Sequence, residues 1–324
     1  MKSRIIIAVL AILSVCSCSS DRSTEPPTAW MKEARLGAFM HFLPGESNFD
    51  LVDQFDVDYL ADQLKSIGAG YFVFTLGQNS GYYNAPNPVY DEISGYKAGE
   101  RTSERDIPME LAKALKKRGI PMMLYLPMQT PNRDMQAVVN FGFPAEAENQ
   151  DRQFTVEGTD NWAKVIGWWS DHYGKLVRGW WFDGGYEWIG VNDSIREKYS
   201  KAVKSGNSRS IACFNCGVVD TPTKTGPAED YTSGEVYNLL EARIPGDSVD
   251  GIQSHVLSFI GGNWGTRDCR FNIEDLKRWV VDATGKGTAV TLDMGPNYDP
   301  EVAPVGSISK EQADQFRQLS AALK

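Results

Sequence analysis

The chain has 324 residues, of which 42% are hydrophobic and 23% are charged, a composition that excludes a fibrous or intrinsically disordered protein. Its formal net charge of −9 at pH 7 makes nucleic acid an unsuitable partner, because a phosphate backbone binds to basic surfaces. The 9 Trp and 13 Tyr residues suit either a large core or a site that stacks on sugar rings.

Residues 1–17 have the pattern of a bacterial signal peptide. Lys2 and Arg4 give the start of the chain a positive charge, and an apolar run follows over 5–15. This run is too short to span a bilayer and has the length of the hydrophobic part of a secretory signal. We therefore expect this segment to be removed on export.

The end of that segment resembles the bacterial lipobox. Cys18 follows the small residue Ser17, whereas Cys16 follows a bulky residue, so Cys18 is the predicted lipidation site. An ordinary cleaved signal peptide with incidental cysteines is the alternative. Residues 18–28 are then predicted to tether a single domain, 29–324, to the bacterial cell envelope, on the periplasmic or the outer-surface face.

The rest of the chain alternates between short apolar runs and segments of helical periodicity. Apolar residues between 55 and 67 recur at the spacing of one helix face, and Gly68 ends that helix. Another helix has Pro108 at its start and Gly119 after its end. Helices are predicted over 55–67, 108–118, 161–176, 193–205, 273–284 and 309–323, and strands over 37–42, 71–75, 121–126, 179–183, 210–215, 230–236, 254–260 and 289–293.

Eight strands separated by helices or long loops predict an α/β protein with a closed (β/α)₈ barrel in a single domain. A doubly wound sheet is the rival arrangement, but no glycine-rich phosphate-binding loop follows any of the predicted strands. In a barrel, the residues at the carboxyl ends of the strands face the active site. These positions hold His41, Gln78, Asn79, Tyr125, Asp183, Asn215, Glu235, Asn263, Trp264 and Asp293.

Two carboxylates in this set are the candidates for catalysis. Asp183 follows the aromatic run Trp180–Phe182 and precedes two glycines, so it emerges from a buried strand where the backbone can turn sharply. Glu235 ends the segment Asp230–Glu235. A turn aspartate and a surface glutamate are the alternative interpretations. Two carboxylates across a pocket are typical of glycoside hydrolysis, in which one attacks the sugar or guides water and the other donates a proton.

Several short segments along the chain, including those that hold Asp183 and Glu235, form a recognisable set of motifs. They are Trp30–Phe42, Phe55–Asp58, Gly68–Tyr71, Arg105–Ile107, Lys117–Gly119, Trp181–Gly184, Asp230–Glu235, Thr284–Gly287, Leu292–Asn297 and Ser309–Gln312. This set resembles glycoside hydrolase family 29, the retaining α-L-fucosidases, over residues 30–324. The resemblance implies an exo-acting glycosidase that cleaves a terminal deoxy- or related L-sugar from a glycan by double displacement, with Asp183 as the nucleophile and Glu235 as the acid/base.

The sequence departs from this family at positions that hold the sugar. Gln78 and Asn79 replace a His-His pair, and they form hydrogen bonds but cannot become charged near neutral pH. Phe42 stands where the family has Trp, and Cys216 stands where Arg is common, although His41 is kept. We therefore expect a substrate other than a plain α-L-fucoside, and a glycosidase for another sugar, such as an α-L-arabinoside or an α-galactoside, is one alternative. A glycan-binding surface lipoprotein without catalysis is the other alternative.

His41, Gln78, Asn79, Tyr125 and Trp264 are the predicted sugar contacts. Trp264 lies in a glycine-rich loop, which suits either a sugar platform or a loop that packs on the barrel. The tyrosines that are further candidates for the pocket wall are Tyr82, Tyr83 and Tyr186.

No metal and no organic cofactor are expected, because two carboxylates suffice for this chemistry. Cys213 and Cys216 have the CxxC spacing, but none of the three His residues completes a zinc ligand set with them. A disulfide between one of these two cysteines and Cys269 is left open by the sequence.

Overall fold

The computed structural model describes residues 25–147 and 152–324. The predicted signal peptide and the predicted lipidation site, Cys18, lie outside the described residues. Seven parallel strands form one sheet in the order β5-β4-β3-β2-β1-β9-β8. These strands are β1 (Leu36–Met40), β2 (Tyr71–Thr75), β3 (Met122–Pro127), β4 (Val177–Asp183), β5 (Ile211–Phe214), β8 (His255–Phe259) and β9 (Ala289–Asp293).

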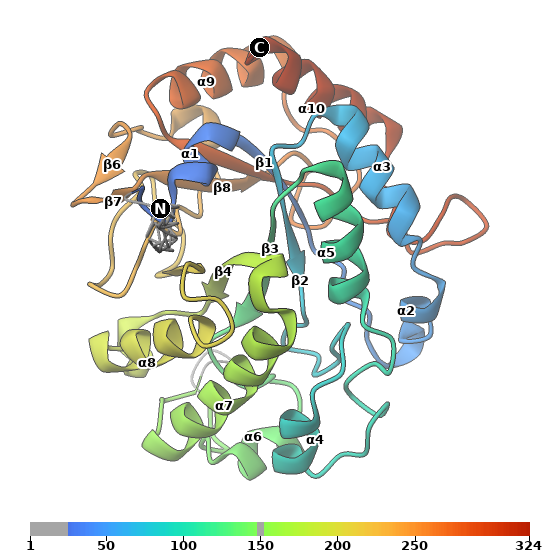
Figure 1. Ribbon diagram of the computed structural model, residues 1–324, viewed down its shortest axis with the longest axis vertical. Helices are drawn as coiled ribbons and strands as arrows, with labels where there is room; N and C mark the ends of the chain where they lie inside the picture. Colours follow the sequence, from blue (N-terminus) through green and yellow to red (C-terminus); the bar gives the residue numbers. More distant parts are fainter. Residues whose placement is uncertain (1–24, 148–151) are drawn as a thin grey trace, which may run out of the picture.

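Helices surround this curled sheet, as Figure 1 shows. The longer ones are α3 (Val57–Ile67), α5 (Ile107–Arg118), α7 (Val156–Tyr173), α8 (Asp193–Val203), α9 (Ile273–Gly285) and α10 (Lys310–Ala322). The shorter ones are α1 (Ala29–Ala34), α2 (Leu51–Gln54), α4 (Pro88–Ser94) and α6 (Met135–Phe141). The arrangement confirms the predicted α/β class and the (β/α)₈ barrel.

The predicted long helices are all present, because their caps are built into the sequence. In α5, the Asp106 side chain accepts a hydrogen bond from the backbone of Met109, and Gly119 ends the helix in the left-handed conformation at φ 74°. The helix predicted from residue 161 begins earlier, at Val156, because the Thr155 side chain caps it. The short helices and a small antiparallel hairpin, β6 (Ser248–Val249) and β7 (Ile252–Gln253), were not predicted.

The predicted strand over 230–236 is wrong as a regular strand, although the segment lies where the barrel needs it. It forms isolated bridges at Tyr231 and Glu235 to residues 253 and 257, and its first backbone N–H donates to Ala212 of β5. It therefore fills the gap between β5 and β8 and completes the ring. The regular ladder fails because side chains take the backbone groups between the two bridges.

These side chains are Thr232 and His255. The Thr232 hydroxyl bonds both the backbone N–H and the carbonyl of His255, and His255 Nδ1 lies 2.9 Å from the Thr232 carbonyl oxygen. Gly234 follows at φ 59°, where an added Cβ would lie 2.0 Å from the His255 carbonyl oxygen. The backbone here thus passes too close to β8 for any residue with a side chain.

The strands separate two apolar layers, because successive side chains point to opposite faces of a sheet. Along β4, Trp180 and Phe182 pack outward against the helices, whereas Trp181 points into the barrel. Phe39, Met123 and other buried residues fill the interior with Trp181. The barrel is thus a packed core, and a site can open only at one of its ends.

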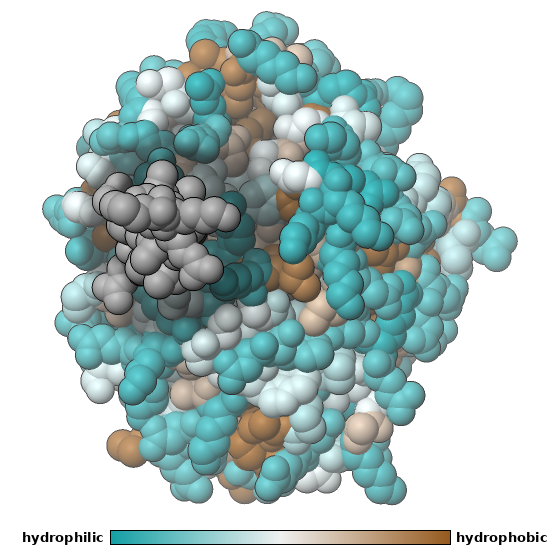
Figure 2. Space-filling model, viewed as in Figure 1, coloured by the Kyte–Doolittle hydropathy of each residue, from teal (hydrophilic) through white to brown (hydrophobic). Residues whose placement is uncertain are grey.

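Polar residues cover most of the molecular face in Figure 2, and apolar residues appear there as separate patches. Among the helices of the described residues, none has the length and apolar character needed to cross a membrane.

Candidate active site

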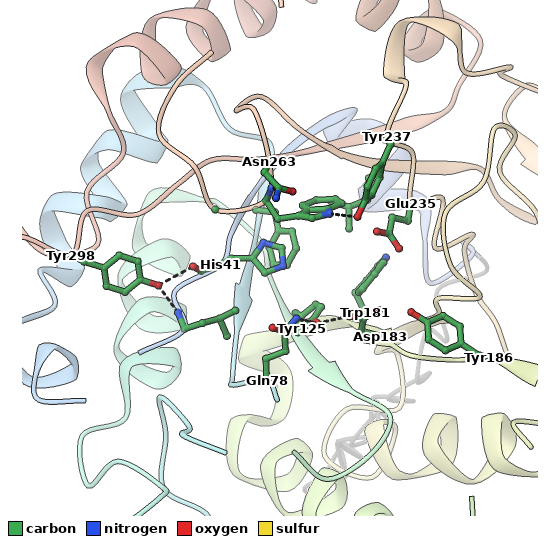
Figure 3. A pocket seen from close by; sticks show the side chains of 15 residues that line it. His41, Gln78, Tyr125, Trp181, Asp183, Tyr186, Glu235, Tyr237, Asn263 and Tyr298 are labelled. Atoms are coloured by element: carbon green, nitrogen blue, oxygen red, sulfur yellow. Dashed lines mark hydrogen bonds between the residues drawn. The ribbon is translucent and has the colours of Figure 1, made fainter. Parts of the chain in front are cut away.

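A pocket of about 610 Å³ opens at the carboxyl ends of the barrel strands. Figure 3 shows its side chains converging from strands and loops that are far apart in the sequence. Its wall is formed by Phe39, His41, Leu43, Gln78, Tyr125, Trp181, Asp183, Tyr186, Glu235, Tyr237, Leu257, Asn263, Trp264, Gly265 and Tyr298. Both predicted catalytic carboxylates therefore line one hollow at the end of the barrel where active sites of this fold lie.

Asp183 is the last residue of β4, and three donors hold its carboxylate. Oδ2 accepts a hydrogen bond from the Tyr125 hydroxyl at 2.6 Å. Oδ1 accepts from the backbone N–H of Gly184 at 2.9 Å and from the side chain of Asn215 at 3.0 Å. Gly184 has a φ of 80°, which only glycine adopts readily. The turn after β4 thereby fixes the carboxylate in one orientation at the pocket wall.

Asn215, the first residue after β5, joins the two carboxylates. Its Nδ2 donates one hydrogen bond to Asp183 Oδ1 at 3.0 Å and another to Glu235 Oε2 at 2.6 Å. The two carboxyl groups therefore share one small amide as their neighbour on the pocket wall. Asn215 is fully buried, and its Oδ1 accepts from the Gly217 backbone, so the direction of the amide is fixed.

Glu235 reaches the pocket from the segment that fills the gap between β5 and β8. Burial of its carboxyl and the nearby charge of Asp183 raise its pKa to about 7, against the lowering effects of the Asn215 hydrogen bond and of His41. A carboxyl with this pKa still holds its proton on many molecules at neutral pH. That is the requirement for a general acid.

His41 lies just beyond β1 and is oriented by a buried carboxylate. Its Nδ1 lies 2.9 Å from Asp293 Oδ1. Because a carboxylate oxygen accepts, Nδ1 is the nitrogen that carries the hydrogen in this contact. Asp293 Oδ2 accepts a further hydrogen bond from the Gly265 backbone at 2.6 Å. Asp293 thus links His41 to the loop that carries Trp264.

Trp264 forms part of an aromatic wall. Its ring centroid lies 5.4 Å from that of His41 and 4.7 Å from that of Phe259, and its Nε1 donates to the Tyr237 hydroxyl at 3.2 Å. The glycine-rich loop therefore places the indole at the pocket as well as packing it on the barrel. The position of Trp264 is compatible with both interpretations that the sequence suggested, and its contact with a sugar stays a prediction.

Of Gln78 and Asn79, which stand where the family pattern has histidines, only Gln78 lines the main pocket. Gln78 Nε2 donates to the Tyr125 hydroxyl at 2.6 Å, and Tyr125 in turn donates to Asp183. Asn79 does not line the main pocket but a neighbouring cavity of about 80 Å³, whose wall also includes Gln78 and Asp183. Gln78 therefore acts on Asp183 through Tyr125, a relation that residue spacing does not indicate.

Some residues at the site were not assigned a role from the sequence. Asn215 and Asp293 stand at strand ends, which was the available signal, but their contacts to Asp183 and His41 depend on the closure of the barrel. Tyr237 stands two residues after Glu235, so an extended chain turns both side chains to one face.

Of the three candidate tyrosines, Tyr186 lines the pocket, whereas Tyr82 and Tyr83 lie elsewhere. Tyr83 is fully buried against Tyr90, and Tyr82 packs beneath the guanidinium of Arg101.

Cys213, Cys216 and Cys269 are free thiols, and no disulfide joins any two of them. Within the described ranges, no group of three or more His, Cys, Asp or Glu side chains is arranged to hold a metal ion. His172 pairs with the helix cap Asp106, on the outside of the barrel.

A barrel whose terminal pocket holds two carboxylates, bridged by one amide, has the features of the glycoside hydrolase barrels. A family model described as Alpha-L-fucosidase matches residues 46–324, and the chain therefore belongs to the alpha-L-fucosidase family. This confirms the family that the sequence motifs resemble. Among curated proteins, no match to the chain was found.

Solved structures share the fold at low sequence identity. The endo-fucoidan hydrolase MfFcnA4 from glycoside hydrolase family 107 is 15% identical, with a TM-score of 0.70, over 92% of this chain and 54% of its own. The alpha-L-fucosidase AlfC from Lactobacillus casei is 16% identical, with a TM-score of 0.62, over 92% of this chain and 98% of its own. Alpha-L-fucosidase isoenzyme 1 from Paenibacillus thiaminolyticus is 19% identical, with a TM-score of 0.63, over 91% and 74%. This chain thus spans about half the length of the fucoidan hydrolase.

Proposed function

We propose that this chain is a retaining exo-glycosidase that releases a terminal α-L-fucose or a related L-sugar from a glycan. The proposal rests on one observation: the side-chain amide of Asn215 donates hydrogen bonds to both Asp183 and Glu235, which line the same pocket. Membership of the alpha-L-fucosidase family supports the class of sugar.

The proposed reaction has two steps. Asp183 attacks the anomeric carbon while Glu235 gives its proton to the leaving oxygen, so a glycosyl ester forms as the glycosidic bond breaks. Glu235, now ionised, takes a proton from water, and the oxygen of that water replaces Asp183 at the anomeric carbon. Two inversions give net retention, and both carboxyl groups return to their starting state.

The surroundings of each carboxyl suit its proposed role. The charge of Asp183 and the burial of Glu235 keep the proton on Glu235 until the leaving oxygen takes it. The hydroxyl of Tyr125 and the amide of Asn215 hold Asp183 in line for attack. His41 and Trp264 lie where they can contact the hydroxyls and the apolar face of the bound sugar.

The sugar itself is proposed on the family and on the names of similar structures, which include alpha-L-fucosidases and fucoidan hydrolases. Gln78 is uncharged and donates a hydrogen bond to Tyr125, so its contacts with sugar hydroxyls would differ from those of a histidine pair. An α-L-arabinoside and an α-galactoside are therefore included in the test.

The decisive experiment is an assay on aryl glycosides of α-L-fucose, α-L-arabinose and α-galactose, together with fucosylated glycans. We expect release of the sugar by wild type, with the α anomer as the first product in NMR spectra, and no release by Asp183→Ala. Asp171→Ala, which removes an exposed carboxylate from α7, is the matched control. Binding of the glycans without any release would support the non-catalytic alternative instead.

We also propose that the protein is a lipoprotein of the bacterial cell envelope, anchored through Cys18. The support is the signal-like segment before that residue. Metabolic labelling with an alkyne fatty acid should mark the wild-type protein and Cys16→Ala but not Cys18→Ala.

A further inference from the structure

A stacked pair of aromatic residues, Tyr186 and Trp188, lies at the edge of the pocket. Tyr186 lines the pocket, and the ring of Trp188 stacks on it with a centroid distance of 5.5 Å and an interplanar angle of 8°. Trp188 is 52% exposed, which is unusual for the largest apolar side chain. The two rings thus form a parallel aromatic stack that reaches from the pocket wall into solvent.

This surface lies apart from the groups that would hold the sugar in the pocket. In Figure 3, Asp183 and Glu235 stand between His41 on one side and Tyr186 on the other. The hydrogen-bonding groups around His41 and Gln78 suit a sugar whose hydroxyls must all be recognised. Beyond the carboxylates, the wall on the other side includes the ring of Tyr186.

The backbone beneath Trp188 is held in place, so the exposed ring is not on a loose loop. The short 3₁₀ helix Glu187–Ile189 buries Ile189, whose carbonyl accepts from the Phe154 backbone at 2.9 Å. The carbonyl of Trp188 itself accepts from the Gln153 side chain at 3.2 Å. A ring that is exposed on a fixed backbone loses little entropy when a ligand stacks on it.

We propose that Tyr186 and Trp188 form the binding site for the part of the glycan beyond the cleaved bond. The pyranose ring next to that bond would lie against the exposed side of this aromatic stack through its C–H groups, so the substrate is a glycan of at least two sugar rings. This inference rests on the proposed function, because it takes Asp183 and Glu235 as the point of cleavage.

Two substrates with the same terminal sugar test this site. The leaving group of α-L-fucosyl fluoride is a single atom with no ring to stack, whereas a fucoidan-derived fuco-oligosaccharide has a sugar ring there. We expect Trp188→Ala to lower kcat/KM for the oligosaccharide about ten-fold more than for the fluoride, and Trp188→Phe to restore most of the difference, since stacking depends on an aromatic face. Tyr59→Ala, which removes an exposed aromatic ring from α3, should change neither value.

Equal effects of Trp188→Ala on both substrates would overturn the inference. If wild type cleaves neither substrate, the proposed function fails, and binding decides the role of Trp188 separately. In that case, calorimetry with the fuco-oligosaccharide and with free L-fucose should show that Trp188→Ala weakens binding of the oligosaccharide alone. Equal loss for both ligands, or no loss for either, would contradict the proposed site.

Discussion

Asp183 and Glu235 accept hydrogen bonds from the same side-chain nitrogen, that of Asn215, at 3.0 and 2.6 Å. One neutral amide thus sets the distance between two carboxyl groups and stabilises negative charge on either of them. It is the shared contact on which the proposed division between nucleophile and acid/base depends.

Asn215→Ala should lower activity and shift its pH dependence. The Asn215 hydrogen bond lowers the pKa of Glu235, so its removal raises that pKa and moves the alkaline limb of kcat/KM to higher pH. The loss of two hydrogen bonds to carboxylates should also lower kcat by about 10- to 100-fold. A full pH profile measures both effects. A lower rate with an unchanged alkaline limb would contradict the effect of Asn215 on the pKa of Glu235. Asn215→Ser, which keeps a smaller polar side chain, is the comparison variant.

The wild-type pH profile should itself report Glu235. The proposed acid must be protonated, and its pKa is raised to about 7, so kcat/KM should fall as the pH rises through about 7. In Glu235→Gln this limb should disappear, because the amide does not titrate. Rates on glycosides with poor leaving groups should fall by about 10²- to 10⁴-fold, and those with good leaving groups should fall less. An alkaline limb that persists in Glu235→Gln would assign it to another group.

The fold could be predicted from the sequence because its signals are local. The apolar run before Asp183, and the Asp and Gly residues that cap α5, act within a few positions of the chain. The irregular form of the segment 230–236 could not be predicted. Its irregularity comes from Thr232 and His255, which exchange hydrogen bonds only after the barrel has closed.

The same distinction holds for the site. The position of Asp183 follows from its own strand, whereas the roles of Asn215 and Asp293 follow from contacts between strands distant in sequence. Gln78 illustrates the limit most clearly. Its replacement of a histidine is visible in the sequence, but its partner, Tyr125, lies 47 residues away on β3.

Gly234→Ala tests the close approach of the irregular segment to β8. The new Cβ would meet the His255 carbonyl oxygen at 2.0 Å and would also force a side chain into the left-handed region. We expect a loss of at least about 2 kcal/mol in the free energy of unfolding, measured with urea. Gly167→Ala, in α7, adds a Cβ that meets no atom within 4 Å beyond its chain neighbours and the backbone of its own helix, so it should instead stabilise by up to about 1 kcal/mol. Equal effects of the two substitutions would contradict this account.

The stability of the barrel should depend on pH through His255. The ring is fully buried: its Nδ1 lies 2.9 Å from the Thr232 carbonyl and its Nε2 lies 2.7 Å from the Thr291 hydroxyl, so both nitrogens are engaged by neutral partners. Burial lowers its pKa from 6.5 to about 4. Below pH 6.5, His255 therefore binds a proton in the unfolded chain but not in the folded chain. Because of this difference, the free energy of unfolding falls as the pH drops towards 4.

A shift of this size corresponds to about 3 kcal/mol at pH 4. Carboxyl groups titrate over the same range, so the measurement is a comparison of wild type with His255→Gln, which keeps hydrogen-bonding groups but does not titrate. Between pH 7 and pH 4, urea unfolding of wild type should lose about 3 kcal/mol more than that of the variant. Parallel losses in the two proteins would mean that His255 accepts its proton within the folded barrel, and that the buried contacts with Thr232 and Thr291 do not exclude its charged form.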